Sequence, residues 1–198
     1  MIFNIMQGKT LKFSLRSGLS LCKCLTETDK QTAYEVIRLN RESKGYPLRM
    51  TYSQVAETIK ILDHDFFVVK VGEVPIASAI VFCITEQIYQ VIYWGDVPGY
   101  SQYKPINYLS YKLIEYYKQK NIRYLDIGPS SESGIPNFGL CDFKQSIGCE
   151  TQNTRLCNSI AWRTPVATLF LAMKGCNALS KLEGPTNFGM MRPAIECA

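Results

Sequence analysis

The hydrophobic pattern of the chain begins with an alternation that is typical of a strand. Residues 18–25, GLSLCKCL, place Leu19, Leu21 and Lys23 on one side. The preceding residues 9–17, KTLKFSLRS, fit a helix or a strand, and periodicity alone leaves both open. The pattern therefore predicts a sheet strand from about residue 18, after a segment of undecided structure.

Two capping signals predict a pair of helices after this strand. Thr28 and Gln31 form a capping box ahead of a helix that extends to about Arg41. Thr51 and Gln54 form a second box, and the breaker sequence KGYP separates the two helices. The apolar face of the second helix repeats at helical spacing: Tyr52, Val55, Ile59 and Leu62.

Three apolar runs then predict an antiparallel meander. They cover residues 66–71, 74–84 and 88–95, and the connectors between them are only two or three residues long. Connectors this short join antiparallel strands. The middle run is apolar on both faces, so it is expected inside the sheet.

A strand–helix–strand order follows the meander. Pro105 suits the first position of a helix, and Asn121 suits a left-handed residue at its end. Residues 122–128, IRYLDIG, read as the next strand. A helical crossover makes the flanking strands parallel, so the strands that carry Trp94 and Asp126 are expected to be parallel neighbours.

The remaining chain predicts a helix, a strand and a C-terminal helix. Asn137 caps a helix from Phe138 that Gly148 ends. Residues 151–162 read as a last strand, 164–182 as a helix, and the tail 184–198 looks loose.

The predicted organisation is one domain with two appendages. Residues 18–160 form the domain, 1–17 an N-terminal extension, and 161–198 a C-terminal helix and tail packed on it. The length of 198 residues and the hydrophobic content of 46% suit a globular protein with a sizeable core.

Charge and cysteine content narrow the function classes. The net charge of +5 suits an anionic ligand, but no Lys/Arg block marks a nucleic-acid surface. The eight cysteines contain no C-x-x-C pair and there is one histidine, His64, so no metal site is expected. Cys22 and Cys24 read as small buried hydrophobes. No signal peptide or apolar run of membrane-spanning length is visible, which favours the cytoplasm.

The element order resembles the GNAT acyltransferase fold. The segments DIGPSS, residues 126–131, and GLCDFKQSIG, residues 139–148, also resemble a signature of the Fem-type branch, which includes peptidoglycan bridge-forming aminoacyl transferases. The resemblance implies an α+β fold in α/β/α layers. Its central sheet is mixed and mainly antiparallel, with one parallel splayed strand pair and helices on both faces.

The resemblance also implies where an acyl donor lies. In that fold the donor occupies the gap between the splayed strands, with its pyrophosphate near the N-terminus of the central helix. The sequence GDVPGYSQYKPIN lacks the usual Gln/Arg-x-x-Gly-x-Gly/Ala loop. The amides of a helix N-terminus bind anions without a particular side chain, and Lys104 could add a point charge. Fem-type enzymes carry two such halves and this chain has room for one, so a second subunit, as in a homodimer, could supply the other.

Four residues are the catalytic candidates. Lys144 could hold a phosphate or carboxylate and stabilise an oxyanion, while the alternative is a solvated helix lysine. Asp126 could orient an amine or accept its proton, or cap the turn by bonding the amides of the following serines. Tyr93 could protonate a leaving group, and Asp96, or else Glu86, could act as a general base.

Eight residues are the donor-binding candidates. The main chain at the end of the meander would pair with the donor like an added strand. The serines follow the carboxyl end of a parallel strand, where ligands bind in open α/β sheets, and loop hydrogen bonding is their alternative role. Phe143 is expected to pack so that it fixes the direction of Lys144. The set is Trp94, Gly95, Tyr103, Lys104, Asn107, Ser130, Ser131 and Phe143.

The expected activity is N-acyl transfer by direct attack of an amine on a bound thioester or ester. Acetyl-CoA or another acyl-CoA is the favoured donor, and aminoacyl-tRNA is the alternative that the Fem-type resemblance implies. The acceptor would be a small-molecule or peptide amine. A non-catalytic binding module and an RNA-binding protein remain the other classes, and a steep salt dependence would distinguish RNA binding.

Overall fold

The computed structural model describes residues 9–46, 48–132, 135–154 and 190–196. The predicted helix at 164–182 therefore lies outside the described residues. The elements are α1 Lys9–Arg16, β1 Leu19–Lys23, α2 Glu27–Ser43, α3 Tyr52–Thr58, β2 His64–Val71, β3 Val74–Thr85, β4 Ile88–Asp96, the 3-10 turn η1 Ser101–Tyr103, α4 Pro105–Gln119, β5 Tyr124–Asp126, β6 Ser131–Glu132, β7 Ile135–Pro136, α5 Phe138–Ser146, β8 Glu150–Thr154 and β9 Met190–Glu196.

The described strands form one large sheet and a small hairpin of β6 and β7. The large sheet has the order β1-β2-β3-β4-β5-β9-β8. Only β4 and β5 pair in parallel; the other pairs in the described sheet are antiparallel. The predicted meander and the single parallel pair are confirmed. The segment 9–17, undecided from sequence, forms helix α1, which packs against α4.

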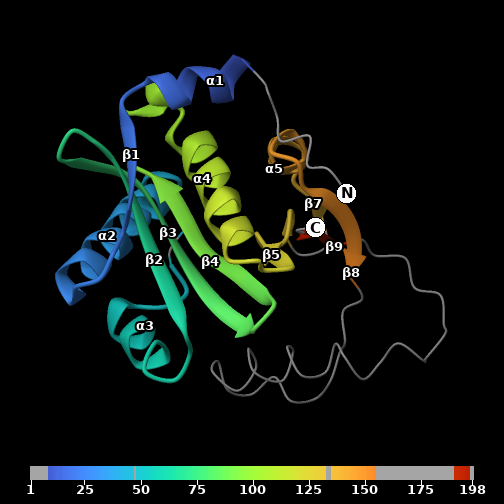
Figure 1. Cartoon of the computed structure of the whole chain (residues 1–198), viewed down its shortest axis with the longest axis horizontal. Helices are drawn as coiled ribbons and strands as arrows, with labels where there is room; N and C mark the ends of the chain where they lie inside the picture. Colours follow the sequence, from blue (N-terminus) through green and yellow to red (C-terminus); the bar gives the residue numbers. More distant parts are fainter. Residues whose placement is uncertain (1–8, 47, 133–134, 155–189, 197–198) are drawn as a thin grey trace.

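Helices cover both faces of this sheet, as Figure 1 shows for α4 on one side and α2 and α3 on the other. Alternation along β2 explains the two cores. Phe67 and Val69 face α4 and pack with its buried residues, while Phe66 and Val68 face α2 and α3. Phe66 and Phe67 are both 1% exposed, so β2 is an interior strand rather than a half-solvated one. The predicted layered α+β architecture is confirmed.

The C-terminal tail differs from its prediction as a loose segment. Residues 190–196 form β9, which pairs with β5 on one side and with β8 on the other. Pro193 cannot donate to a ladder, and the segment lacks alternation, so its local pattern does not read as a strand. Its order comes from long-range pairing, for example Leu125 opposite Ile195.

The helix caps follow local sequence signals, with one correction. The predicted box at Thr51 and Gln54 is present at the start of α3. The first box is wrong by two residues, because α2 is capped by Thr26 and Asp29. Thr26 Oγ1 accepts from the Asp29 amide, and Asp29 adds a carboxylate to the first turn, where the helix dipole favours it. Asn121 has the predicted left-handed conformation, with φ 55°.

An ionic cluster closes the end of the sheet where β4 begins. The Asp65 carboxylate is 6% exposed and pairs with the Lys23 amine at 2.5 Å. It also accepts a hydrogen bond from the Tyr117 hydroxyl at 2.9 Å, with Lys120 at 3.7 Å. These contacts join β1, β2 and the last turns of α4, so the sheet and α4 are fixed together at this end. Burial and the Asp65 charge raise the pKa of Tyr117 far above its ordinary value.

Candidate active site

The parallel strands β4 and β5 separate after a short ladder. They pair only at Ile88–Tyr124, Tyr89–Leu125 and Gln90–Asp126. Strand β5 then ends, whereas β4 continues to Asp96. From Val91 onward, no described strand pairs with β4 on the side away from β3. The main chain of β4 therefore offers peptide donors and acceptors to a ligand, which is the predicted splayed arrangement.

A bulge in β4 lies within this unpaired stretch. Tyr93 pairs with Ile80 and Val91 with Val81, which leaves Ile92 as the extra residue. As a result Ile92 and Tyr93 both pack on the α2 face, while Trp94 packs on the α4 face. Bulges of this kind bend a strand and are common next to active sites.

The N-terminus of α4 faces the same end of β4, because α4 follows β4 through a short loop and returns along the sheet. Pro105 occupies the first helical position and has no amide proton. The Tyr108 amide bonds the Lys104 carbonyl, so Ile106 and Asn107 carry the amides that lack a partner in the helix. Lys104 is exposed and left-handed, with φ 52°. These groups form a helix terminus suited to an anion, without the usual glycine loop.

Lys144 is buried and is not the solvated lysine of the alternative interpretation. Its side chain is 3% exposed, and its Nζ donates to the carbonyl oxygens of Gly128 at 2.8 Å and Pro129 at 2.9 Å. Burial lowers the pKa of the Lys144 amine to about 8, although the neighbouring Cys149 and Asp126 act in the opposite direction. In this geometry Lys144 holds the loop that follows β5.

Asp126 stabilises the turn of the same loop. It accepts hydrogen bonds from the Gln90 amide group at 3.0 Å and from the Gly128 amide at 2.8 Å. The amide bonded is thus that of Gly128, not of the predicted serines. Ser130 is 2% exposed and its carbonyl accepts from the Asn137 amide. The hydroxyl of Ser131 is buried with no hydrogen-bond partner among the described residues.

Aromatic side chains connect the two sides of the splayed pair. The rings of Trp94 on β4 and Phe143 on α5 meet edge to face, with centroids 6.0 Å apart. Both pack against the α4-side core, as does Tyr103, which stacks on Tyr100 at 6.3 Å. The structure therefore brings Trp94 and Phe143 together on the α4 side of β4.

Tyr93 and Asp96 are held from the α2 side. Burial raises the pKa of Tyr93, and the backbone of Met50 and the charges of Arg49 and Arg41 act in the opposite direction. Asn40 on α2 donates its side-chain amide to the Asp96 carbonyl at 2.7 Å and to its carboxylate at 2.9 Å. Tyr93 thus lies on the face of β4 opposite to Trp94.

Two residues important to this geometry were missed in the sequence. Asn40 continues the helical stripe of Ala33 and Ile37, so a polar residue at a core position was the available signal. Asn40 is 3% exposed and touches Gly95, where an added Cβ would lie 2.8 Å from the Asn40 Cβ. Gln90, which bonds Asp126, carried no such signal.

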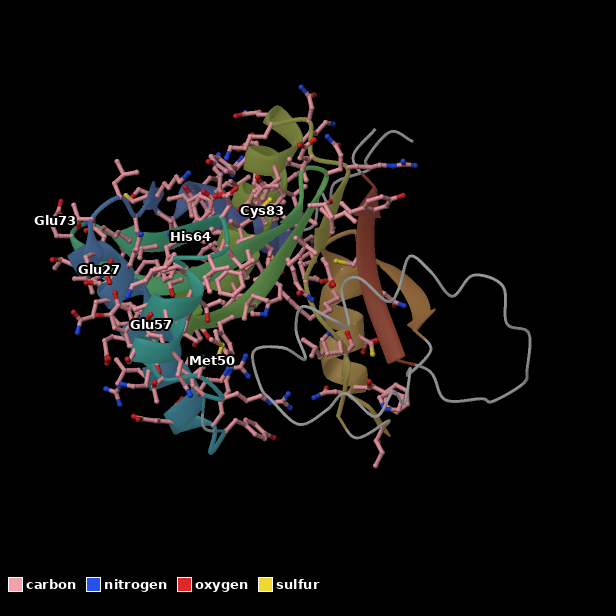
Figure 2. All side chains as sticks on the ribbon, turned by 90° about the horizontal axis from the view of Figure 1, so that it is seen from below. Glu27, Met50, Glu57, His64, Glu73 and Cys83 are labelled. Atoms are coloured by element: carbon pink, nitrogen blue, oxygen red, sulfur yellow. The ribbon has the colours of Figure 1, made fainter. Side chains whose placement is uncertain are left out.

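Glu86, the alternative general base, and His64, the one histidine, lie at the other end of the sheet. Glu86 is in the turn before β4, a full strand away from Asp96, so it does not share the site. His64 begins β2, with its Nδ1 bonded to the Leu62 carbonyl and Nε2 to Lys30. Figure 2 shows Met50 well apart from His64 and Cys83. Cys22, expected to be buried, is exposed, whereas Cys24 is buried as predicted.

The buried amine of Lys144 predicts a specific pH dependence of stability. Its pKa falls from the ordinary 10.5 to about 8 in the folded state, so between these values the unfolded chain binds more protons. The free energy of unfolding of the wild type should therefore rise relative to Lys144→Met as the pH increases through this window. Urea unfolding of both proteins across the window measures the difference. Parallel curves would contradict the buried amine.

Comparisons with known proteins identify the fold. No family model and no curated protein sequence matches the chain. A GNAT family acetyltransferase from Elizabethkingia anophelis with acetyl-CoA bound is similar at a TM-score of 0.57 and 10% identity, over 91% of this chain and 99% of that one. A CoA-bound acetyltransferase from Bacillus subtilis has a TM-score of 0.51 and 13% identity, over 90% and 98% of the two chains.

FemX, of the Fem-type branch, is similar over part of its length. Its TM-score is 0.60 at 13% identity, over 73% of this chain and 54% of that one. The chain therefore corresponds to about half of FemX, as a single GNAT domain. Together with the splayed β4–β5 pair, these likenesses show that the chain has the GNAT fold.

Two general features of the described residues bear on the site. They contain no group of three or more His, Cys, Asp or Glu side chains that could hold a metal ion. No helix among them has the length and apolar character needed to cross a membrane.

Proposed function

We propose that this protein is an N-acyltransferase that uses an acyl-CoA, with acetyl-CoA as the simplest donor. One observation carries the proposal: β4 leaves its parallel partner after Gln90, and from Val91 to Asp96 no described strand pairs with this edge, which a short loop connects to the α4 N-terminus. A linear amide chain that ends in a pyrophosphate fits both features, because its amides can pair with the edge of β4 and its pyrophosphate can bind at the α4 N-terminus. The acetyltransferases of the same fold that hold acetyl-CoA or CoA support this donor class.

The chain's own groups fit each part of such a donor. Peptide groups of β4 between Val91 and Asp96 would pair with the donor's amides, as an added strand does. The free amides of Ile106 and Asn107, with the charge of Lys104, would bind the pyrophosphate. Lys144 and Asp126 would act as positioning residues, because their hydrogen bonds fix the loop at Gly128 that borders the gap.

The thioester supplies an activated carbonyl, and the protein supplies placement. The amine lone pair forms the new C–N bond, the carbonyl oxygen takes up negative charge, and the C–S bond breaks to release the thiolate. A peptide N–H of the bulge at Ile92 and Tyr93 could stabilise that oxygen. The ammonium proton leaves to solvent, and the released thiolate takes up a proton from solvent. No covalent intermediate with the protein is required.

Equilibrium dialysis with labelled acetyl-CoA tests the proposal. We expect saturable binding that unlabelled CoA competes away, and acetylation of amines from a mixed panel detected by mass spectrometry. Aminoacyl-tRNA is the second donor to be tried, because the chain resembles a half of FemX in fold. If neither donor binds, the protein is a non-catalytic GNAT-fold module and the proposal is wrong.

A further inference from the structure

Two arginines lie on the α2 side of the unpaired strand. Arg41 is in the last turn of α2, directly after Asn40, whose side chain rests on Gly95. Arg49 belongs to the segment between α2 and α3. The charges of both arginines act on the Tyr93 phenol. Arg41 thus lies near the end of α2, on the face of β4 opposite to Trp94 and Phe143. The exposed Arg49 stands between Leu48 and Met50, which pack on the same face.

The guanidinium group of Arg41 has no partner in the described part of the chain. Its Nε is buried and unbonded, and none of the described ion pairs involves Arg41 or Arg49. By contrast, Arg38, one turn earlier on α2, is paired with both Glu35 and Glu42. A buried donor of a charged group that has no acceptor raises the free energy of the folded protein, and a bound ligand can supply the acceptor.

Apolar and phenolic groups pack on the same face as the half-buried Arg41 and the exposed Arg49. Tyr34 and Tyr93 belong to the α2-side core, together with Met50 and Ile92. The Tyr34 hydroxyl donates to the Met50 carbonyl at 2.9 Å, which fixes the segment next to Arg49. The α2 side of β4 thus brings cationic donors near two tyrosines, and the described acidic residues Glu42 and Asp96 are already bonded to Arg38 and Asn40.

We infer that the acceptor is an amine that carries its own carboxylate, a free amino acid, with the carboxylate bound by Arg41 and supported by Arg49. The inference rests on the proposed function, since the donor would pair along the free edge of β4 and the acceptor would reach the bulge from the Tyr93 side. A guanidinium binds a carboxylate through two parallel hydrogen bonds, which also sets its orientation. That orientation would place the α-amine toward the main chain at Ile92 and Tyr93.

Matched pairs of acceptors test the inference. L-phenylalanine and L-phenylalaninamide differ in the carboxylate, and the amide has the less protonated amine at neutral pH, so amine reactivity alone would favour the amide. With acetyl-CoA at saturation, we expect the acid to have a kcat/KM roughly 10- to 100-fold higher. Other amino acids and their amides serve as further pairs, and dialysis measures their binding to the CoA-saturated protein.

Three variants assign the preference to a residue. Arg41→Met should raise KM for the acid by roughly 10- to 100-fold and leave the amide unchanged. Arg41→Lys keeps the charge but cannot form two parallel hydrogen bonds, so its KM for the acid should lie between those of the wild type and Arg41→Met. Arg38→Met is the matched control on the same helix, and we expect it to keep the wild-type preference. Circular dichroism checks that each variant is folded.

The outcomes separate the two proposals. Failure to bind either donor overturns the proposed function, and this inference with it. Where the donor binds, three results would overturn the inference alone. The protein uses acids and amides equally, or it binds no amino acid when saturated with CoA, or Arg41→Met weakens both acceptors equally. Acid preference that Arg41→Met abolishes establishes the carboxylate site.

Discussion

Replacing Gly95 by alanine is expected to lower the free energy of unfolding by about 1–3 kcal/mol, the usual cost of overpacking. The added Cβ would lie 2.8 Å from the Asn40 Cβ and 2.9 Å from its Cγ and Oδ1. Asn40 cannot move freely, because it is 3% exposed and bonded to Asp96. Denaturant unfolding measures the loss, and donor affinity should fall too, since Gly95 is part of the unpaired main chain.

A second glycine provides the matched control. Gly139 lies in α5, where an added Cβ would meet only the Asn137 Oδ1 at an ordinary 3.7 Å. Gly139→Ala should therefore stabilise the protein, by about 0.5–1 kcal/mol from helix propensity. In the Asn40→Ala background Gly95→Ala should cost less than it does alone, because the contacts with the Asn40 Cγ and Oδ1 are removed and only the contact with its Cβ remains. Equal effects at both glycines, or strict additivity with Asn40→Ala, would contradict the described contact.

Asn107→Asp is expected to raise the stability of the protein and to lower its affinity for the donor. Asn107 is the third residue of α4, so a new carboxylate there should stabilise the free protein by about 0.3–1 kcal/mol through the helix dipole. The same charge would repel a pyrophosphate at this terminus, and we expect acetyl-CoA affinity to fall about tenfold or more. Equilibrium dialysis and thermal unfolding measure the two effects independently.

The control places the same charge at the other end of the helix. Gln119 is the exposed last residue of α4, and Gln119→Glu changes the net charge by the same amount. We expect it to leave donor affinity unchanged and to destabilise the protein slightly, because its charge lies at the negative end of the dipole. If both variants weaken binding alike, the effect is one of net charge and the α4 site is wrong.

Local signals in the sequence predicted most of the fold. The short connectors of the meander, Pro105 at the start of α4 and Asn121 at its end all describe interactions within a few residues. The parallel neighbours β4 and β5 followed from the helical crossover between them. Strand β9 could not be predicted in this way, because the pairing of Ile195 with Leu125 depends on residues far apart in the sequence.

The sequence indicated where the candidate residues lie along the chain, but not the directions of their side chains. The sequence indicated that Lys144 lies near the loop after Asp126, but its burial depends on Gly128 and Pro129, which only the folded loop brings to its amine. Tyr93 and Trp94 were both assigned to the candidate site, whereas strand alternation directs them to opposite faces. Arg41 was not selected at all, because its missing partner is a property of the three-dimensional surroundings.

Hydrogen exchange of the β4 amides, with and without saturating CoA, tests the central claim most directly. The account predicts that CoA, once dialysis has shown it to bind, slows exchange in the segment from Val91 to Val97 and at the first turn of α4. Strands β1 and β2 should be unaffected, since they lie on the other side of β3. Binding that protects a different surface and leaves these β4 amides unchanged would contradict the assignment of the splayed strands as the donor site.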